Sequence, residues 1–458
     1  MVLSKFKTTC LMAGALLAAV PGVANAETSE IEQMRAEMAQ MRAEMAQLKA
    51  DSQGDWLAGS RRAEIEGLIA DVFADAENRA TLLQEGALAG IDEKGKIFLQ
   101  SADGGFSAQF SGQVQQRYIF NSLNTDGGRS DSLSGFQARR QKLGIKGKLA
   151  DGWGYKVVFA TNRDGGPGGG NTFTEDAYIT KKINDNFSLL VGTNKLPFAR
   201  QELISSSKSV AVDRSPVTEF FTLNRSDQVT LIYKTDNVIA HLALSDGGNR
   251  DFTDFNNDVS NDFAVTGRVE WMVFGDDLKE ATTEFGGVDK DHLFLAGAFH
   301  YESAEGTADP ESGLAWTAEA LYKTGAWGLS TAVFGNHTNN RAAADTDQFG
   351  VYAQASYQLG EGWDVFGQWN YIDDDGVGAG DNDELQAVVF GFNKHFSSRV
   401  KLTTDVIWVY SGDDPSADGN FINGGELSDG IGLGSGGFTG NDDHGDQVAF
   451  RMQLQLLF

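Results

Sequence analysis

The chain ends in Val448-Ala-Phe-Arg-Met-Gln-Leu-Gln-Leu-Leu-Phe458, in which apolar and polar side chains alternate. Successive side chains of a β-strand point to opposite faces, so this period of two predicts a strand with one apolar and one hydrated face. The apolar face would carry Val448, Phe450, Met452, Leu454, Leu456 and Phe458, and the opposite face would carry Arg451, Gln453 and Gln455. We expect the apolar set to face lipid and the polar set to face water.

The same period of two recurs upstream. Residues 106–120, 349–359, 363–371 and 400–410 repeat it, and Gln116 breaks it in the first of these segments. About sixteen such segments occur, each near the ~9–11 residues that a tilted strand needs to cross a bilayer. They begin near residues 106, 137, 153, 173, 186, 228, 238, 262, 292, 314, 326, 348, 362, 385, 399 and 446. The pattern predicts an all-β fold, a transmembrane antiparallel β-barrel of about sixteen strands over residues 96–458.

The connections between these segments alternate in length. Asp236-Asn237 and Gly325-Ala326 are tight turns, whereas residues 411–446 form a long segment rich in Gly, Asp and Asn. Short turns on one rim and long loops on the other are typical of a membrane barrel. A soluble sandwich also alternates, but aromatic residues near strand ends, such as Trp363 and Trp408, fit the girdles at a membrane interface.

Composition excludes several classes of function. The formal net charge of −27 argues against nucleic acid as a partner. The sequence has no run of 18 apolar residues, so it predicts no transmembrane helix. Cys10 is the only cysteine, so a disulfide framework and a cysteine metal site are excluded. The six histidines form no H-E-x-x-H pair and no G-x-S-x-G occurs, so we expect no enzyme, cofactor or metal.

The N-terminus has the features of a secretory signal over residues 1–26. Lys5 and Lys7 precede an apolar run over residues 11–20, and Ala24-Asn25-Ala26 is a cleavage site of the A-x-A kind. We therefore expect export, with a mature chain from Glu27. A retained membrane anchor is the alternative.

Two helical segments are predicted before the barrel, both in the periplasm. The heptad at residues 31–48 predicts a short coiled coil over residues 27–52, and an apolar face from about Arg61 to Glu85 predicts a helix within residues 53–95. The heptad positions are Ile31, Met34, Met38, Met41, Met45 and Leu48. These helices could bring copies of the chain together, or they could be solvated helices packed under the barrel.

Several motifs resemble those of bacterial outer-membrane proteins. The final strand with its terminal Phe458 looks like the signal that the barrel assembly machinery reads. Phe136-Gln-Ala-Arg-Arg-Gln-Lys-Leu-Gly-Ile-Lys-Gly-Lys-Leu149, Gly152–Lys156, Leu190–Leu203 and Ser205–Lys208 are similar to the phosphate-selective porin family, porins O and P. The resemblance covers roughly residues 100 to 225. It implies a homotrimer of sixteen-stranded outer-membrane barrels, each with a pore narrowed by inward-folded loops.

One departure from the family concerns selectivity. Members that select phosphate line the pore with an arginine ladder and a lysine cluster, and this chain keeps part of one ladder on the predicted strand from residue 137. The chain as a whole is acidic. The resemblance therefore leaves phosphate selectivity open.

The first site candidates are basic residues at the alternate positions of a strand, opposite its apolar side chains. A charge on the lipid face at mid-membrane costs about 2–4 kcal/mol, so these residues should face the lumen. They could form an anion track, or they could pair with acidic neighbours and hold the wall. The candidates are Arg117, Arg140, Lys142, Lys146, Lys148 and Arg451.

A polar segment at about residues 195–225 is the second candidate, too long for a turn and too polar for a membrane strand. It could fold inward and set the constriction, as the resemblance implies, or remain a rim loop. The residues that could act there are Lys195, Arg200, Glu202, Lys208, Asp213, Arg214 and Glu219. The acidic stretches 373–376, 381–384 and 413–414 could bind calcium, although solvated turns are commoner.

Two functions follow from these patterns. The first is an outer-membrane porin, a passive diffusion channel for small hydrophilic solutes that could include anions such as phosphate. The alternative is a structural anchor that links the barrel to the periplasm or cell wall through the coiled coil.

Overall fold

The computed structural model describes residues 40, 43, 87–92, 96–124, 130–162, 171–248, 261–304, 311–341, 345–374, 383–412 and 447–458. The chain divides into two compact units, Met1–Leu82 and Leu83–Phe458. The predicted signal, coiled coil and helical segment lie outside the described residues, apart from helical Gln40 and Ala43 and a few residues after 86. No helix among the described residues is long and apolar enough to cross a membrane.

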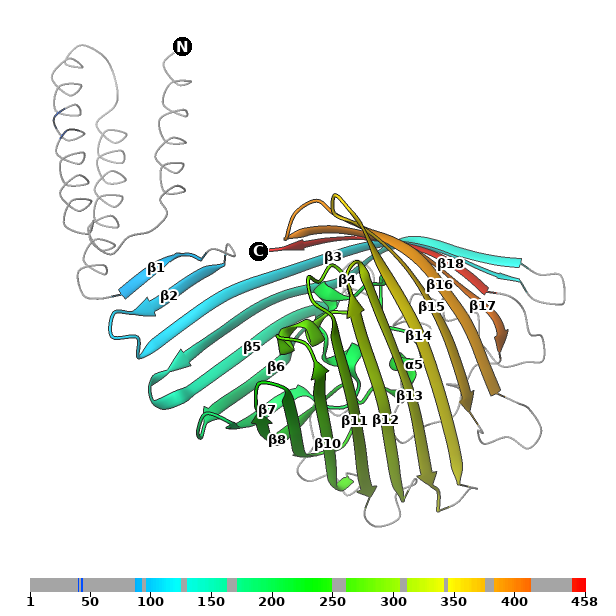
Figure 1. The fold of residues 1–458 in the computed structure, drawn as a ribbon, viewed down its shortest axis with the longest axis horizontal. Helices are drawn as coiled ribbons and strands as arrows, with labels where there is room; N and C mark the ends of the chain where they lie inside the picture. Colours follow the sequence, from blue (N-terminus) through cyan, green and yellow to red (C-terminus); the bar gives the residue numbers. More distant parts are fainter. Residues whose placement is uncertain are drawn as a thin grey trace, which may run out of the picture. The chain divides into compact units, whose positions relative to one another are not determined.

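Sixteen strands among the described residues of the second unit form a closed antiparallel barrel (Figure 1). They are β3 (Phe106–Asn124), β4 (Ser130–Leu149), β5 (Trp153–Asn162), β6 (Asn171–Lys182), β7 (Phe187–Lys195), β8 (Arg225–Lys234), β9 (Val238–Ser245), β10 (Asn261–Phe274), β11 (His292–Ala304), β12 (Ser312–Thr324), β13 (Trp327–Asn339), β14 (Thr346–Gly360), β15 (Trp363–Asp374), β16 (Asp383–His395), β17 (Val400–Gly412) and β18 (Gln447–Leu457). Each pairs with its sequence neighbour, and β18 closes the ring on β3, with Leu456 opposite Val114. The prediction of about sixteen antiparallel strands is confirmed.

The outer face of the barrel is apolar, as the alternation predicts. Trp327, Trp363 and Trp408 point outward and keep 38–47% of their surface exposed. The same face carries the apolar set of β18, including Leu454 and Leu456. A closed barrel pairs every strand edge, which is what the hydrocarbon core of a membrane requires.

The inner face of β18 differs from the expectation that its polar residues meet water. Arg451, Gln453 and Gln455 do point inward, but each is at most 3% exposed. The connection between β7 and β8 covers them, and Gln455 donates a hydrogen bond to the backbone oxygen of Ser207 at 3.2 Å. Strand periodicity predicts the direction in which a side chain points. It does not predict whether a distant loop folds over that side chain.

A hairpin extends the sheet at the start of the barrel. It consists of β1 (Ala87–Ile91) and β2 (Ile97–Ser101), and β2 pairs with β3 near Gln109. Residues 87–91 therefore form a strand where a helical segment was expected. The five residues of β1, Ala-Leu-Ala-Gly-Ile, are too few to distinguish the two periods.

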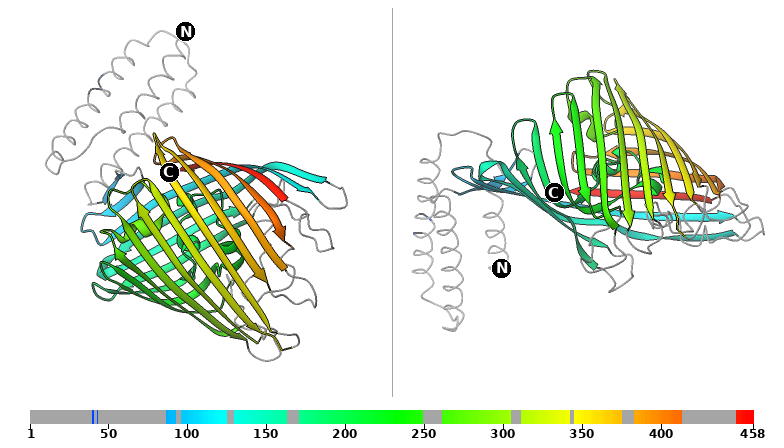
Figure 2. Two further views of the ribbon diagram at one scale, coloured as in Figure 1. Left: turned by 45° about the vertical axis from the view of Figure 1, so that its right-hand side comes forward. Right: turned by 90° about the horizontal axis from the view of Figure 1, so that it is seen from below.

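The connection between β7 and β8, residues 196–224, folds inside the ring of strands (Figures 1 and 2). We call it the luminal loop. It contains α4 (Arg200–Leu203), the 3-10 turn η2 (Ser206–Lys208) and α5 (Pro216–Phe221). Ser215 caps α5 by accepting a hydrogen bond from the Thr218 amide at 2.9 Å, and Pro216 occupies the first turn, where a missing N–H is harmless.

The apolar side of the luminal loop packs on the inner wall. Phe221 stacks on Phe334 of β13 at 5.3 Å between ring centroids, and Tyr352 of β14 joins the same buried cluster. Small residues such as Ala315 and Ala332 fill the inward positions beneath the loop. The loop is therefore seated against β11–β17, and its polar side is left facing β3–β8.

A second connection also enters the lumen. Residues 275–291 join β10 to β11 and contain the 3-10 turn η3 (Leu278–Thr282). We call this segment the strap. Its Phe285 packs against the same apolar cluster as the luminal loop.

Candidate functional site

A cavity of about 770 Å³ lies between the luminal loop and the wall formed by β3–β8. Most of its charged lining side chains are basic. The basic ones are Lys96, Arg139, Arg140, Lys142, Lys156, Lys195, Arg214 and Arg225, and the acidic ones are Glu175, Asp176 and Glu219. Fixed positive charge in a narrow passage with low-dielectric walls concentrates anions. The cavity is thus basic although the chain is acidic.

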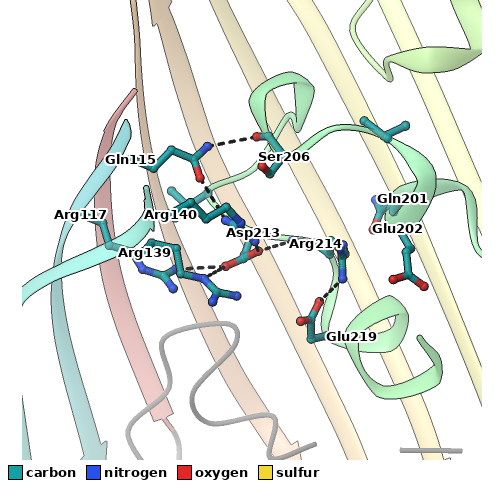
Figure 3. A network of polar contacts seen from close by, with 12 residues as sticks. Gln115, Arg117, Arg139, Arg140, Gln201, Glu202, Ser206, Asp213, Arg214 and Glu219 are labelled. Carbon is teal, nitrogen blue, oxygen red and sulfur yellow. Dashed lines mark hydrogen bonds and ion pairs between the residues drawn. The ribbon is translucent and has the colours of Figure 1, made fainter. Parts of the chain in front are cut away.

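Asp213 of the luminal loop binds three arginines of the wall (Figure 3). Its carboxylate lies 3.2 Å from Arg117 Nη1, 3.0 Å from Arg139 Nε and 2.9 Å from Arg140 Nη2. Burial alone would raise the pKa of Asp213, but the three guanidinium groups outweigh burial and hold its pKa well below the usual range. One carboxylate among three cations anchors the loop and leaves the region positively charged.

Arg139 and Arg140 are adjacent in sequence and both face inward because of a β-bulge. Arg140 pairs with Gln115 and Gln137 pairs with Arg117, so two residues of β4 oppose the single Gln116 of β3. Strict alternation would point Arg139 outward. The break in alternation at Gln116 was the only sign of this bulge in the sequence.

A second bulge brings two acidic residues into the cavity. Val158 pairs with Asp176 and Phe159 with Thr174, which leaves Glu175 as the extra residue on β6. Glu175 then accepts from Lys142 at 2.5 Å, whereas Lys156 binds Asp176 at 2.7 Å. Arg225 of β8 lies 3.1 Å from Glu175 and 2.7 Å from Asp176. Three cations on two carboxylates again leave positive charge.

The luminal loop supplies the opposite side of the cavity. Arg214 Nη1 lies 3.2 Å from Glu219 Oε2, and both side chains line the cavity. Lys195 donates to the backbone oxygen of Glu202. The Glu202 carboxylate is fully buried, and neither of its oxygens has a hydrogen-bond partner among the described residues.

The structure separates the predicted constriction residues into two groups. Lys195, Arg214 and Glu219 line the cavity. The others do not line it. Asp213 lies in the arginine cluster and Glu202 is buried. Arg200, 2.9 Å from Glu270, and the exposed Lys208, 2.9 Å from Thr282, line a separate cavity of about 290 Å³.

The predicted pore-lining residues fall into three groups: those that line the cavity, those buried in ion pairs, and those exposed near the end of β4. Arg140 and Lys142 line the cavity, whereas Arg117 and Arg451 are buried in ion pairs with Asp213 and Asp405. Lys146 and Lys148 are exposed nearer the end of β4.

Sequence reasoning missed Lys156, Glu175, Asp176 and Arg225 as lining residues. The available signal was a charge at an inward position of β5 or β8, and for Glu175 no signal existed because the bulge is invisible in the sequence.

Metal binding has no support among the described residues. No group of three or more His, Cys, Asp or Glu residues there is placed to hold a metal ion. The acidic stretches proposed for calcium fall largely outside the described part, at 375–376, 381–382 and 413–414.

Residues 110–269 match the family "Phosphate-selective porin O and P". A comparison with curated protein sequences finds no match.

Solved porin structures share the fold at low identity. An anion-selective porin from Comamonas acidovorans superposes with a TM-score of 0.53 and 16% identity, over 77% of this chain and 100% of that one. The loop L8 deletion mutant of OmpT from Vibrio cholerae gives a TM-score of 0.52 and 10% identity over 77% and 100%. The outer-membrane channel DcaP of Acinetobacter baumannii gives a TM-score of 0.51 and 12% identity over 78% and 99%.

These findings agree with the motifs quoted from the sequence. The matched residues span the arginine cluster, the bulged acidic pair and the whole luminal loop. The barrel of this chain has the fold of these outer-membrane porins. The family that the sequence motifs resemble is the one whose model matches residues 110–269, the phosphate-selective porins O and P, and those residues lie in a barrel with the fold of outer-membrane porins.

Proposed function

We propose that this porin is a passive diffusion channel that prefers small hydrophilic anions. The observation that carries the proposal is the basic lining of the cavity, with eight cationic and three acidic side chains. A small anion there exchanges its water shell for Lys and Arg donors, and a cation meets net repulsion. The related Comamonas porin is described as anion-selective.

Phosphate is one candidate solute within this class. Arg139, Arg140 and Arg225 offer planar donor groups that suit oxyanions. Each of them is also engaged by a carboxylate, at Asp213 or at Asp176. We therefore propose that phosphate passes with other small anions and is not strongly retained.

The chain is proposed to work as a homotrimer in the outer membrane, with its N-terminal helices in the periplasm. The family resemblance and the heptad at residues 31–48 support this. The mass of the purified protein in mild detergent tests it, together with a variant that lacks residues 27–94. The proposal predicts a trimer for the intact chain, and two monomeric species would overturn it.

Conductance across a planar bilayer tests the channel directly. Purified protein should give stepwise current increments in potassium chloride, and added phosphate should lower the chloride current modestly while carrying current itself. A barrel that inserts and stays closed to ions would instead support a structural anchor. Block of the chloride current at low phosphate concentration would indicate a phosphate-retaining pore.

A further inference from the structure

The strap is longer than a turn between two strands requires. The neighbouring turn from β12 to β13 needs only Gly325 and Ala326, whereas the strap uses residues 275–291. Its first residues are fixed near the strand ends. His292 Nε2 lies 3.0 Å from Asp276 Oδ1, and the buried Lys323 lies 2.9 Å from Glu280.

The middle of the strap is packed tightly against the inner wall. A Cβ on Gly286 would lie 2.1 Å from the backbone oxygen of Ala326, so only glycine fits there. Ser356 of β14 donates to the backbone oxygen of Glu284 at 2.9 Å. Lys401 Nζ lies 5.4 Å from the centroid of the Phe285 ring. The strap is therefore a structured part of the lumen.

The Glu284 carboxylate joins the wall to the luminal loop. This side chain is 4% exposed, and its Oε2 accepts from Gln354 of β14 at 2.8 Å and from Gln201 of α4 at 3.1 Å. Burial raises its pKa. Loss of the carboxylate would leave the buried Gln201 amide without its acceptor and the Gln354 amide with only the longer, 3.4 Å contact to Ser330 Oγ, which is costly in a dry interior.

Gln201 also binds the part of the luminal loop that lies next to the cavity. Its Oε1 accepts from the Ser215 amide at 3.0 Å and from Thr218 Oγ1 at 3.0 Å. Ser215 follows Arg214, whose side chain lines the cavity. A single amide thus bridges the strap and the start of α5.

We infer that the strap is a positioning element for the luminal loop, and that Glu284 acts through Gln201 to hold Arg214 at the cavity wall. A second contact, from Lys208 Nζ to Thr282 Oγ1 at 2.9 Å, supports α4 and η2 from the same side. Asp213 and the apolar cluster hold the other side of the loop. The inference rests on the proposed function, because it gives Arg214 a role in ion passage.

Three single variants test the inference in the full-length protein in planar bilayers. Glu284→Ala removes the acceptor, Glu284→Gln keeps its size and one acceptor oxygen, and Asp289→Ala removes an exposed charge from the same strap as the matched control. The readout is the fraction of time in sub-conductance states. Glu284→Ala should raise that fraction about 2- to 10-fold, the ratio expected for one buried hydrogen bond. Glu284→Gln should raise it less, and Asp289→Ala should match the wild type.

Gln201→Ala keeps the inference testable if Glu284→Ala does not fold, because it removes only the loop side of the contact. It should raise sub-conductance occupancy in the same way. If both Glu284→Ala and Gln201→Ala spent the same fraction of time in sub-conductance states as the wild type, the inference would be overturned. A wild-type pore without anion preference would overturn the proposed function instead, and unstable current levels in the variants would still support the positioning role.

Discussion

Asp405 of β17 and Arg451 of β18 form a buried two-point ion pair, with Nε 2.7 Å from Oδ1 and Nη2 2.9 Å from Oδ2. The same carboxylate accepts a hydrogen bond from the Val212 amide at 3.0 Å. The last strand, its neighbour and the luminal loop therefore share one carboxylate. A residue expected to border water instead helps to seat the loop.

Arg451→Leu should destabilise the barrel. It leaves Asp405 buried without its counter-ion, and breaking such a pair costs about 3–5 kcal/mol. The midpoint of unfolding in detergent, followed by the shift of the folded band on gels, measures the loss. The Arg451→Leu/Asp405→Leu double variant should recover part of that stability. Equal stability of Arg451→Leu and the wild type would show that the pair does not hold these strands.

Phe221→Ala should loosen the luminal loop and leave the barrel folded. Phe221 is 1% exposed and stacked on Phe334, and truncating such a side chain typically costs about 3–5 kcal/mol. The cost falls on the contact between loop and wall, so single-channel conductance should rise and become noisier. The exposed Phe396→Ala serves as the control. Unchanged conductance would mean that the apolar cluster does not fix the width of the passage.

Lys142→Glu combined with Lys156→Glu should turn the anion preference toward cations. The two changes replace two cavity cations by two carboxylates, next to Glu175 and Asp176. Even about 0.6 kcal/mol of changed interaction with a passing ion is roughly a threefold change in permeability ratio. Reversal potentials in a salt gradient measure it. Lys234→Glu, at the far end of β8, is the control. If both variants gave the same potential, the cavity lining would not set selectivity.

The loop anchor at Asp213 should survive mild acid. Its folded-state pKa lies below the ordinary value of 3.8, so its stabilising effect is complete above that value and is lost only as pH falls through the lower folded value. Open-channel noise should stay flat from neutral pH to about pH 4 and rise only below it. Asp213→Asn should be noisy at every pH. A rise in wild-type noise well above pH 4 would contradict the arginine cluster as the anchor.

The sequence was sufficient for the barrel because strand periodicity is a local property. The alternation that ends at Phe458 predicted the strands of the barrel. The alternating lengths of the connections predicted that the barrel crosses a membrane. The motifs around Arg139 and Lys195 predicted the family. None of these inferences required knowledge of which residues meet across the lumen.

The site was harder to predict because it depends on bulges and distant contacts. A bulge turns Arg139 inward against the parity rule, and another places Glu175 beside Asp176. The strap gave no signal, since Glu284 and Gln201 are 83 residues apart in sequence. Burial of Arg451 likewise follows from a loop more than two hundred positions away.

The sign of the reversal potential of the wild-type channel in a potassium chloride gradient tests the central claim most directly. A passage lined by eight cationic and three acidic side chains should give a potential displaced toward that of chloride. A potential displaced toward that of potassium would contradict an anion-preferring pore, whatever the stability of the barrel.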